Sequence, residues 1–567
     1  MTVPATDPLA IRRPAAPLSR QPRRVGHYLV SGLVAALVLL PVAALIGVAL
    51  QGGTADISHL ARTVLPGAVA TTLILLALVA IGTLSIGITS AWIIANHDFP
   101  LRRFLAFALV LPVAIPPYLA AYAWTDFFNF TGPPQTLLRM MFGWKSARDY
   151  WFPDVRSTIG AAIVLSSVLF PYVYLTARMV FMMQGRNLAD AARMLGARPG
   201  AVFFRILLPV SRPALAAGLA LALMEALNDV GAAEYLGVRT LTLSVFTTWL
   251  NRNSLEGAAQ ISALMLVLVL ALVLAEQWAR RSQRFQGGRA THMKAQASRT
   301  ELSGWRAAAA FSAAALPVFF GFGIPLLVFG GFAMRRLHLF SDPALIAALF
   351  NSVAAAGATA LATVSIALML LNASRNARSG AVTLFSRLAI SGYAIPGTIL
   401  SIGLLFVLAR MDSLYDMFMR QTFGISTGLL LTGTAAAVVI ALTIRFLALA
   451  EGAIRGGYEK LPPNLDDAAR SLGRSPAQST IGVMLPLLKP AIQTAAVLVF
   501  VDTIKELSAT MLLRPFGFST LATHVYESAS RGVPEQGSVA ALLIIVVAVA
   551  PVIALSRALM GDEEARI

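Results

Sequence analysis

The stretch NLADAARMLGARPG, residues 187–200, decides the fold of this chain, because a close copy, NLDDAARSLGRSPA, occurs at residues 464–477. The copies are offset by 277 residues, close to half of the 567-residue sequence. In the 28-residue segments that begin at these copies, 13 positions are identical. The sequence therefore predicts an internal repeat that kept one short polar element. The alternative is a plain duplication in which this element only packs against its own half.

Each copy carries start and stop signals for a short helix. An Asn is expected to cap the helix, and the Asp three residues later to complete a capping box. A Gly suits the C-terminal turn, and a Pro prevents continuation. These residues are Asn187, Asp190, Gly196 and Pro199 in the first copy and Asn464, Asp467, Gly473 and Pro476 in the second. About eight helical residues remain, roughly 12 Å, which is too short to cross a membrane.

The predicted short helices have one apolar side that consists mostly of alanine. Its positions follow the i, i+3, i+4, i+7 spacing of a helix face. They are Leu188, Ala191, Ala192 and Leu195 in the first copy and Leu465, Ala468, Ala469 and Leu472 in the second. Small side chains allow a partner surface to approach closely. The sequence therefore predicts a docking helix in each half.

The composition is that of a polytopic membrane protein. Hydrophobic residues make up 57% of the chain and charged residues 13%, and several apolar runs reach the length of about 20 residues that crosses a bilayer. Lys and Arg outnumber Asp and Glu by 45 to 27, which in such a chain indicates cytoplasmic anchoring rather than nucleic-acid binding. Cys is absent and the six His are scattered, so the sequence predicts no disulfide, thiolate site or zinc cluster.

The apolar runs predict an all-α membrane protein with about 12 transmembrane helices in two parallel six-helix repeats. The expected spans are 28–50, 68–95, 103–125, 158–183, 207–230 and 257–277, then 307–333, 345–372, 384–410, 426–450, 486–510 and 537–556. The predicted organisation is a cytoplasmic tail (1–25), a first half (26–278), a basic cytoplasmic linker (279–305), a second half (306–558) and a cytoplasmic tail (559–567). The N-terminal tail lacks the pattern of a cleaved signal.

The positive charges in short loops predict the orientation in the membrane. On this count of spans one side collects Arg12, Arg13, Arg20, Arg23, Arg24, Arg102, Arg103, Arg186, Arg193, Arg198, the linker, Arg375, Arg378, Arg455, Lys460, Arg470 and Arg474. We expect this side, with both termini, to be cytoplasmic, and residues 126–157 and 514–535 to lie outside. Six spans return the chain to its starting side, so a pseudo-twofold axis along the membrane normal is expected to relate the halves.

The fifth predicted span of each half contains two carboxylates, and the two pairs occupy equivalent places in the repeat. They are Glu225 and Asp229 in the first half and Asp502 and Glu506 in the second. The i, i+4 spacing places each pair on one helix face, roughly 24–30 Å from the start of the span and so near the outer mouth. Ionisable groups within spans tend to line polar pathways, so these residues are candidates for cation passage. The alternative is a structural role in loop caps or ion pairs, for example between Lys505 and Glu506.

A proline-containing stretch interrupts the third predicted span in each half. The two stretches are Ile115-Pro116-Pro117 and Ile395-Pro396-Gly397. Proline is tolerated in membrane helices where neighbours satisfy the freed backbone groups. We expect kinks at these places, with packing favoured over a direct role in a pathway.

In both copies of this chain Asp-Ala-Ala, three residues and Gly precede Leu-Pro, and this pattern resembles the coupling-loop signature of the membrane subunits of bacterial ABC importers. This resemblance implies a permease with two cytoplasmic coupling helices that bind two copies of a separate ATPase subunit, and a periplasmic substrate-binding protein as a further partner. The residues it assigns to ATPase coupling are Asp190, Ala191, Ala192, Gly196, Asp467, Ala468, Ala469 and Gly473. The family usually has Glu where this chain has Asp190 and Asp467. Two signatures in one chain resemble the fused permeases of the bacterial inner membrane.

The segment DTIKELSATMLLRPFGFSTLATHVYESAS, residues 502–530, is similar to the corresponding segment of ferric-iron ABC permeases. Residues 227–249, LNDVGAAEYLGVRTLTLSVFTTW, fit the same group less closely. The resemblance implies ferric iron as the substrate, and a hard trivalent ion prefers oxygen ligands such as carboxylates. Thiamine, phosphonate and sulfate permeases share this architecture and stay open as alternatives.

Motifs for ATP binding and for catalysis are missing from the sequence. It contains no G-x-x-x-x-G-K-[ST] loop, no H-E-x-x-H and no G-x-S-x-G. We therefore expect a translocation subunit that is not an enzyme and binds no cofactor itself, with ATP acting through the partner ATPase. The expected environment is membrane lipid, without nucleic acid. A twelve-helix secondary transporter is the main alternative, and a membrane-embedded enzyme is a weaker one.

Overall fold

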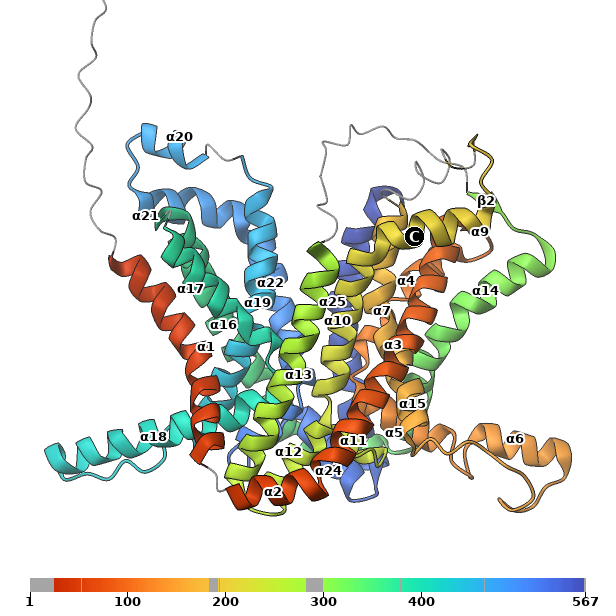
Figure 1. Ribbon diagram of the computed structural model, residues 1–567, viewed down its shortest axis with the longest axis horizontal. Helices are drawn as coiled ribbons and strands as arrows, with labels where there is room; N and C mark the ends of the chain where they lie inside the picture. The colour runs from red at the N-terminus through yellow and green to blue at the C-terminus, as the bar shows by residue number, and fades with distance from the viewer. Residues whose placement is uncertain are drawn as a thin grey trace, which may run out of the picture.

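The computed structural model describes residues 25–51, 54–182, 192, 194–281, 299–377, 379–462 and 465–564. Within them the chain forms a bundle of long helices (Figure 1). One two-residue pair of parallel strands, β1 (His97–Asp98) and β2 (Thr300–Glu301), joins the start of the second half to the first. Among the described residues, eleven helices are long and apolar enough to cross a membrane, or up to twelve if a bent pair counts as one span. The predicted all-α polytopic fold is confirmed.

The helices of the first half alternate between long spans and short connecting elements. They are α1 (Val25–Gln51), α2 (Thr54–Thr63), α3 (Leu65–Asn96), α4 (Arg102–Ala108), η1 (Leu111–Ala114), α5 (Pro117–Phe127), α6 (Pro133–Phe142), α7 (Thr158–Val180), α9 (Pro199–Val202), η3 (Phe203–Leu207), α10 (Leu208–Asn228), α11 (Val230–Tyr235), α12 (Leu241–Leu250) and α13 (Leu255–Arg281). The apolar runs that predicted the spans correspond to α1, α3, α7, α10 and α13.

The elements of the second half follow a similar order, except that one long helix stands where the first half has α5 and α6. They are α14 (Gly304–Val318), η4 (Phe319–Gly323), α15 (Ile324–Arg335), η5 (Leu337–Ser341), α16 (Pro343–Ala377), α17 (Gly380–Ile390), η6 (Ser391–Ala394), α18 (Gly397–Phe423), α19 (Ala436–Glu459), α20 (Leu465–Ser471), α21 (Pro476–Ser479), η7 (Thr480–Met484), α22 (Leu485–Lys505), α23 (Ser508–Leu513), α24 (Leu521–Ser530), η8 (Pro534–Gly537) and α25 (Ser538–Glu564). The span expected at 426–450 begins only at Ala436, because residues 424–435 form the return from α18.

The repeat extends beyond the motif that revealed it. The sequence α9, η3, α10 recurs as α21, η7, α22 with the same 277-residue offset, including the π-helical turn. The hydroxyl of Thr72 accepts from the N–H of Leu241 at 2.9 Å, and Ser352 accepts from Leu521 at 2.7 Å, so α12 and α24 are fixed in the same way. The two halves therefore share local architecture where their sequences differ.

At both proline-containing stretches one helix ends and another begins, instead of a single helix with a kink. Ile115 and Ile395 are extended, with ψ of 112° and 121°, as expected for a residue before proline. New helices start at Pro117 and Gly397, and the first break bends the path by 100°. The third spans were expected at 103–125 and 384–410 with kinks at the prolines, and the structure has full helix breaks there instead, because each X-Pro step ends one helix and starts another.

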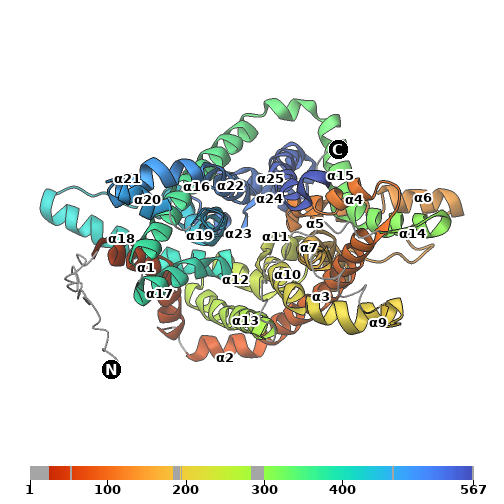
Figure 2. The same ribbon diagram turned by 90° about the horizontal axis from the view of Figure 1, so that it is seen from above.

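The first helix of each half packs against the other half. α1 packs against α16, α17 and α18, while α15 packs against α5 and α14 against α3 (Figure 2). At one crossing a Cβ on Gly403 would lie 2.1 Å from the Pro41 carbonyl oxygen, so only glycine permits this approach. At the other, the indole N–H of Trp124 donates to the carbonyl oxygen of Phe320 at 3.0 Å. This exchange of helices binds the halves together.

The bundle has two distinct ends. One end carries α9, α20, α21 and β2 and is called the signature face here, because the described parts of both repeated motifs lie there (Figure 1). The other end carries α2, α12 and α24 and is called the loop face. α10 and α22 run from the signature face toward the loop face, and their ends lie beside a cavity lined by residues of both halves. Their ends position the candidate site.

Candidate functional site

A polar cavity lies where α10 and α22 end. Its volume is about 60 Å³, enough for a few water molecules. Its walls come from both halves, and their charged and aromatic polar residues are Tyr118, Tyr172, Glu225, Asp229, Tyr393, Arg445, Asp502, Lys505 and Glu506. The structure therefore brings together all four carboxylates that the sequence singled out. They reach one cavity because both helices stop at the same depth.

The two carboxylates of the first half differ in their contacts. Glu225 lies in the last turn of α10, whereas Asp229 follows the helix and caps α11. The Asp229 carboxylate accepts a hydrogen bond from the Ala232 N–H at 2.6 Å. Among the described residues neither carboxylate has an ion-pair partner. The expectation that each i, i+4 pair lies on one continuous helix was wrong, since α10 and α22 end before the second member of each pair.

The two carboxylates of the second half are paired with basic residues. A 2.8 Å ion pair joins Arg445 Nη1, from α19, to Glu506 Oε1, and both side chains are buried. The Lys505 ammonium lies 2.8 Å from Asp502 Oδ1. The predicted candidate pair of Lys505 with Glu506 was therefore wrong: successive residues of a helix point in different directions, and Lys505 turns back to the residue three positions earlier.

Glu506 also organises the backbone that follows it. Its Oε1 accepts from the Ala509 N–H at 2.8 Å, and its Oε2 accepts from the N–H and hydroxyl of Thr510 at 3.1 and 2.9 Å. These bonds satisfy the first N–H groups of α23. Glu506 thus neutralises Arg445 and caps a helix at the same time, which indicates a mainly structural role.

Asn228 connects the halves beside the cavity. Its side-chain oxygen accepts from the Gly397 N–H at 2.7 Å, and its carbonyl oxygen accepts from the Ser508 hydroxyl at 2.9 Å. A Cβ on Gly397 would lie 2.6 Å from Arg445 Nη1, so a larger residue would displace the buried arginine. The start of α18, the end of α10 and the turn into α23 are therefore held together at the wall of the cavity.

Tyrosines lead from this cavity toward the loop face. The Tyr118 hydroxyl is buried and makes no hydrogen bond within the described part of the chain. Tyr122 lies next to it, with ring centroids 5.9 Å apart, and contacts Tyr235 at 4.4 Å. Tyr122 and Tyr235 line a second, open cavity of about 330 Å³. There Tyr526 donates to Glu234 Oε2 at 2.5 Å, which is a direct bond between the two halves.

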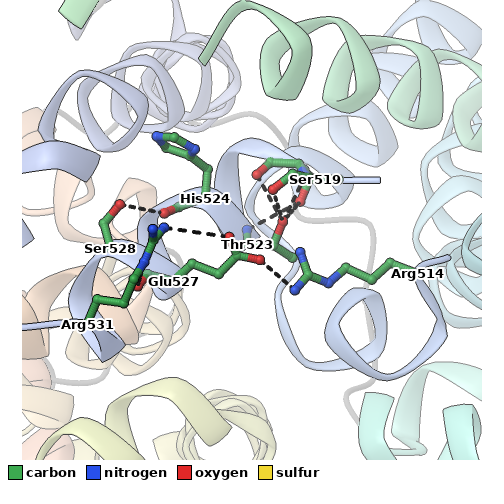
Figure 3. A network of polar contacts seen from close by, with 8 residues as sticks. Arg514, Ser519, Thr523, His524, Glu527, Ser528 and Arg531 are labelled. Atoms are coloured by element: carbon green, nitrogen blue, oxygen red, sulfur yellow. Dashed lines mark hydrogen bonds and ion pairs between the residues drawn. The ribbon is translucent and has the colours of Figure 1, made fainter. Parts of the chain in front are cut away.

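The outer edge of this region is a polar network around α24 (Figure 3). Arg514 Nη2 lies 2.6 Å from Glu527 Oε1, and Arg531 Nη2 lies 3.8 Å from Glu527 Oε2. Thr520 and Thr523 form a capping box at the start of the helix. Burial lowers the pKa of His524 below its ordinary value, because it disfavours the charged imidazolium. The network gives α24 a fixed position beside the second cavity.

The repeated motifs end in the same backbone turn. Gly196 and Gly473 have φ of +83° and +82°, the left-handed conformation that favours glycine. The N–H of Ala197 donates to the Ala192 carbonyl oxygen at 3.0 Å, and that of Arg474 donates to Ala469 at 3.1 Å. These are the bonds of a Schellman cap, so the predicted C-terminal glycines are confirmed.

The apolar side of the motif is divided between the bundle and the exterior. Ala192 and Ala469 are buried, whereas Leu195 and Leu472 are 89% and 85% exposed. Of the other predicted coupling residues, Ala468 is exposed at the start of the same turn. Asp190 and Ala191 lie outside the described residues, as do Asn187 and Asn464, and nothing is described of the Asp467 side chain. The exposed leucines leave an apolar surface on each motif.

Several residues of the cavity were missed in the sequence. Arg445 is a lone charge in the apolar run VVIALTIRFLALA, and an ionisable residue within a span is itself a signal of a polar interior. The tyrosines Tyr118, Tyr172 and Tyr393 gave no such signal, because aromatic residues are common in ordinary helix packing. Within the described residues, no group of three or more His, Asp and Glu is arranged to hold a metal ion.

Two repeats of membrane-spanning helices around a central polar cavity, each with a short capped element at one end, define a transport protein of the permease class. The chain matches the family of binding-protein-dependent transport system inner membrane components over residues 84–284 and 373–561, and it belongs to this family. The two matches correspond to the two halves. The protein is thus a fused permease of an ABC importer and a multi-pass protein of the inner membrane.

Known relatives include permeases for different ions. The chain is 25% identical over 512 residues to the Fe(3+)-transport system permease protein FbpB 2 of Haemophilus influenzae, which covers 89% of this chain and 92% of that protein. It is 28% identical over 253 residues, 44% of this chain and 86% of the relative, to a probable sulfate transport system permease protein of Nephroselmis olivacea. The molybdenum transport system permease protein ModB of Escherichia coli is 28% identical over 213 residues, 36% of this chain and 90% of that protein.

Proposed function

We propose that this permease imports ferric iron. The observation that carries the proposal is the charge of the central cavity. Four acidic and two basic side chains line it, so its formal charge is −2 when all are ionised. Such a wall attracts a cation and repels oxyanions such as sulfate and molybdate. The match to an Fe(3+)-transport permease along most of both chains supports the same substrate.

The oxygen-rich lining suits a hard trivalent cation. Carboxylate and phenol oxygens are the polar groups that Tyr118, Glu225 and Asp229 present, and hard metal ions prefer oxygen ligands. The tyrosines continue toward the second cavity near the loop face. We infer that iron enters there from a periplasmic binding protein and passes between the halves when Tyr122 and its neighbours separate.

Within this proposal the repeated motifs couple transport to ATP. Each presents an exposed leucine and a rigid Schellman cap at the signature face. These features suit a helix that docks in a cleft of one ATP-binding subunit, so two copies of that subunit bind one chain. ATP hydrolysis then takes place in the partner. The signature face and both termini are cytoplasmic, as the positive charges of the short loops indicate.

The unpaired carboxylates supply the test of the substrate. In Glu225→Gln combined with Asp229→Asn, Asn retains the cap of α11 while both charges are lost. We expect ATP-dependent iron uptake into proteoliposomes, with the ATPase and the loaded binding protein present, to fall by roughly tenfold, about 1.4 kcal/mol. Copurification of the ATPase should be unchanged, because the motifs lie at the other face.

The matched control is Glu256→Gln, which removes an exposed carboxylate from the first turn of α13, away from the cavity. Its iron uptake should equal that of the wild type. Unchanged iron uptake in the double variant would refute the proposed role of the cavity. ATP-dependent uptake of sulfate or molybdate by the wild type, with no uptake of iron, would assign the protein to the oxyanion permeases instead.

A further inference from the structure

Two helical arms project sideways from the bundle. The first arm, residues 128–157, consists of α6 and its return loop. The second, residues 409–435, consists of the outer part of α18 and its return loop. The arms extend in opposite directions in both views, at the same level near the loop face and across the direction of the spans (Figures 1 and 2). Each lies between the proline break and the next long helix of its half, α7 or α19, so they are equivalent parts of the repeat.

In the first arm, polar side chains on one side of α6 bind both the segment that leads into the helix and the return loop that follows it. Gln135 donates to the Phe128 carbonyl oxygen at 2.8 Å and accepts from the Tyr150 hydroxyl at 2.5 Å. Arg139 donates to the Phe130 carbonyl oxygen at 2.5 Å. The other side of the helix is apolar and exposed: Leu137, Met140 and Met141 are 56%, 72% and 68% exposed. The i, i+3, i+4 spacing places these three on one face.

The second arm also has a return loop bound to one side of its helix and an exposed apolar face on the other, but with different residues. Asp412 accepts from the N–H groups of Leu431 and Thr432, each at 2.9 Å, and Asp416 accepts from that of Thr427 at 2.7 Å. These bonds hold the return loop on one side of α18. The opposite side presents Met411, Leu414, Tyr415 and Phe418, each 47–56% exposed and spaced i, i+3, i+4, i+7.

We propose that both arms are interfacial helices whose apolar faces insert into the outer leaflet of the membrane. The return loops lie on the side of each arm that faces away from the signature face, so the free apolar faces turn toward the level of the spans (Figure 1). They are therefore continuous with the lipid-exposed surface of the bundle. An amphipathic helix that lies across the direction of the spans buries its apolar face at the headgroup and acyl boundary.

The aromatic residues of the first arm fit the same level of the bilayer. Trp144 stacks on Tyr150, with ring centroids 4.8 Å apart, and Trp151 is 85% exposed. Trp and Tyr concentrate at the interface between membrane and water. A soluble binding protein is a poorer occupant, because under the proposed function it delivers iron to the cavity between the halves, whereas the arms point away from that region in opposite directions (Figure 2).

Depth-dependent quenching tests this proposal, and the Cys-free chain makes single labels possible. Met141→Cys and Leu414→Cys place an environment-sensitive fluorophore on the two apolar faces. Arg148→Cys and Ser413→Cys are the matched controls, since both residues are exposed on the arms but away from these faces. The full-length variants are reconstituted in phospholipid vesicles with lipids that carry a nitroxide near the headgroup. Uptake activity and size-exclusion profiles verify that each variant is folded.

We expect quenching at the apolar positions to exceed that at the control positions by roughly threefold or more, with a blue-shifted emission. Equal quenching at all four positions would overturn the proposal. Weak quenching by lipid, with emission that changes only on addition of the binding protein, would overturn it in favour of that partner. Transfer between labels on different molecules, lost on dilution into excess lipid, would assign the arms to contacts between copies of the chain.

Discussion

At the scale of single residues, the buried pair of Arg445 and Glu506 decides how the central cavity is built. Its two side chains come from α19 and the end of α22, and Glu506 also caps α23. Removal of one member leaves the other charge buried, which costs about 3–5 kcal/mol, whereas removal of both is often tolerated. The pair is thus more important for the shape of the wall than for its charge.

Glu506→Gln should therefore destabilise the protein strongly, and Arg445→Met with Glu506→Gln should regain most of the lost stability. Thermal unfolding in detergent measures both effects. We expect the double variant to regain iron uptake as well, since Glu225 and Asp229 are intact. Lys505→Gln is the control, because Lys505 pairs with Asp502 instead of Glu506. A double variant that is stable yet inactive would show that Glu506 itself contacts the substrate.

At the scale of elements, the Schellman caps make the two motifs rigid. A Cβ on Gly473 would meet no atom within 4 Å, so substitution there costs backbone strain, about 1–2 kcal/mol, and no steric clash. The turn and the exposed Leu472 beside it form the surface that we assign to the ATPase. Substitution of a positive-φ glycine outside the motifs therefore adds the same backbone strain without changing the surface that we assign to the ATPase.

We predict that Gly196→Arg and Gly473→Arg each reduce ATP-dependent uptake and copurification of the ATPase, while the permease is still inserted in the membrane. The cause is a bulky cation at the docking surface. Gly424→Arg is the matched control, because Gly424 has a φ of +71° and an open Cβ position but lies on the second arm. Uptake at the wild-type level in both motif variants would refute the assignment.

At the scale of the whole molecule, the exchanged first helices make each half dependent on the other. A chain divided at Ala290, in the linker, should yield two fragments that copurify when expressed together, because α1 still packs on α16 to α18. Each fragment alone should be degraded, since its swapped surface is uncovered. Affinity purification through a tag on one fragment measures the association. Stable fragments that do not copurify would contradict the exchange.

The orientation is tested with single cysteines and an impermeant reagent on intact cells. We expect labelling of Phe516→Cys, which is fully exposed near the loop face, and of Arg148→Cys on the first arm. Ala290→Cys should react only after the membrane is opened, because basic loops stay in the cytoplasm. Labelling of Ala290→Cys from outside would reverse the topology.

The sequence by itself determined the class of fold, the repeat and the turn that ends each motif. These properties are local: a span needs about 20 apolar residues, and a helix that must end in a left-handed turn needs glycine. The same reasoning placed Glu225, Asp229, Asp502 and Glu506 at equivalent positions, since a repeat offset is arithmetic. Periodicity failed at the Pro116 and Pro396 breaks, where a short extended step replaced a continuous helix.

Only the tertiary structure decided which charges are paired and which are free. The partner of Glu506 is Arg445, 61 residues away in the chain, and no local spacing predicts such a contact. Contacts between distant segments also determine the exchange of α1 and α14 between the halves. The same holds for the tyrosines of both halves that line the central cavity. Such contacts depend on how helices pack in three dimensions. The hydrophobic pattern of a span indicates only that the span is buried in lipid or protein, and it does not indicate which neighbour the span contacts.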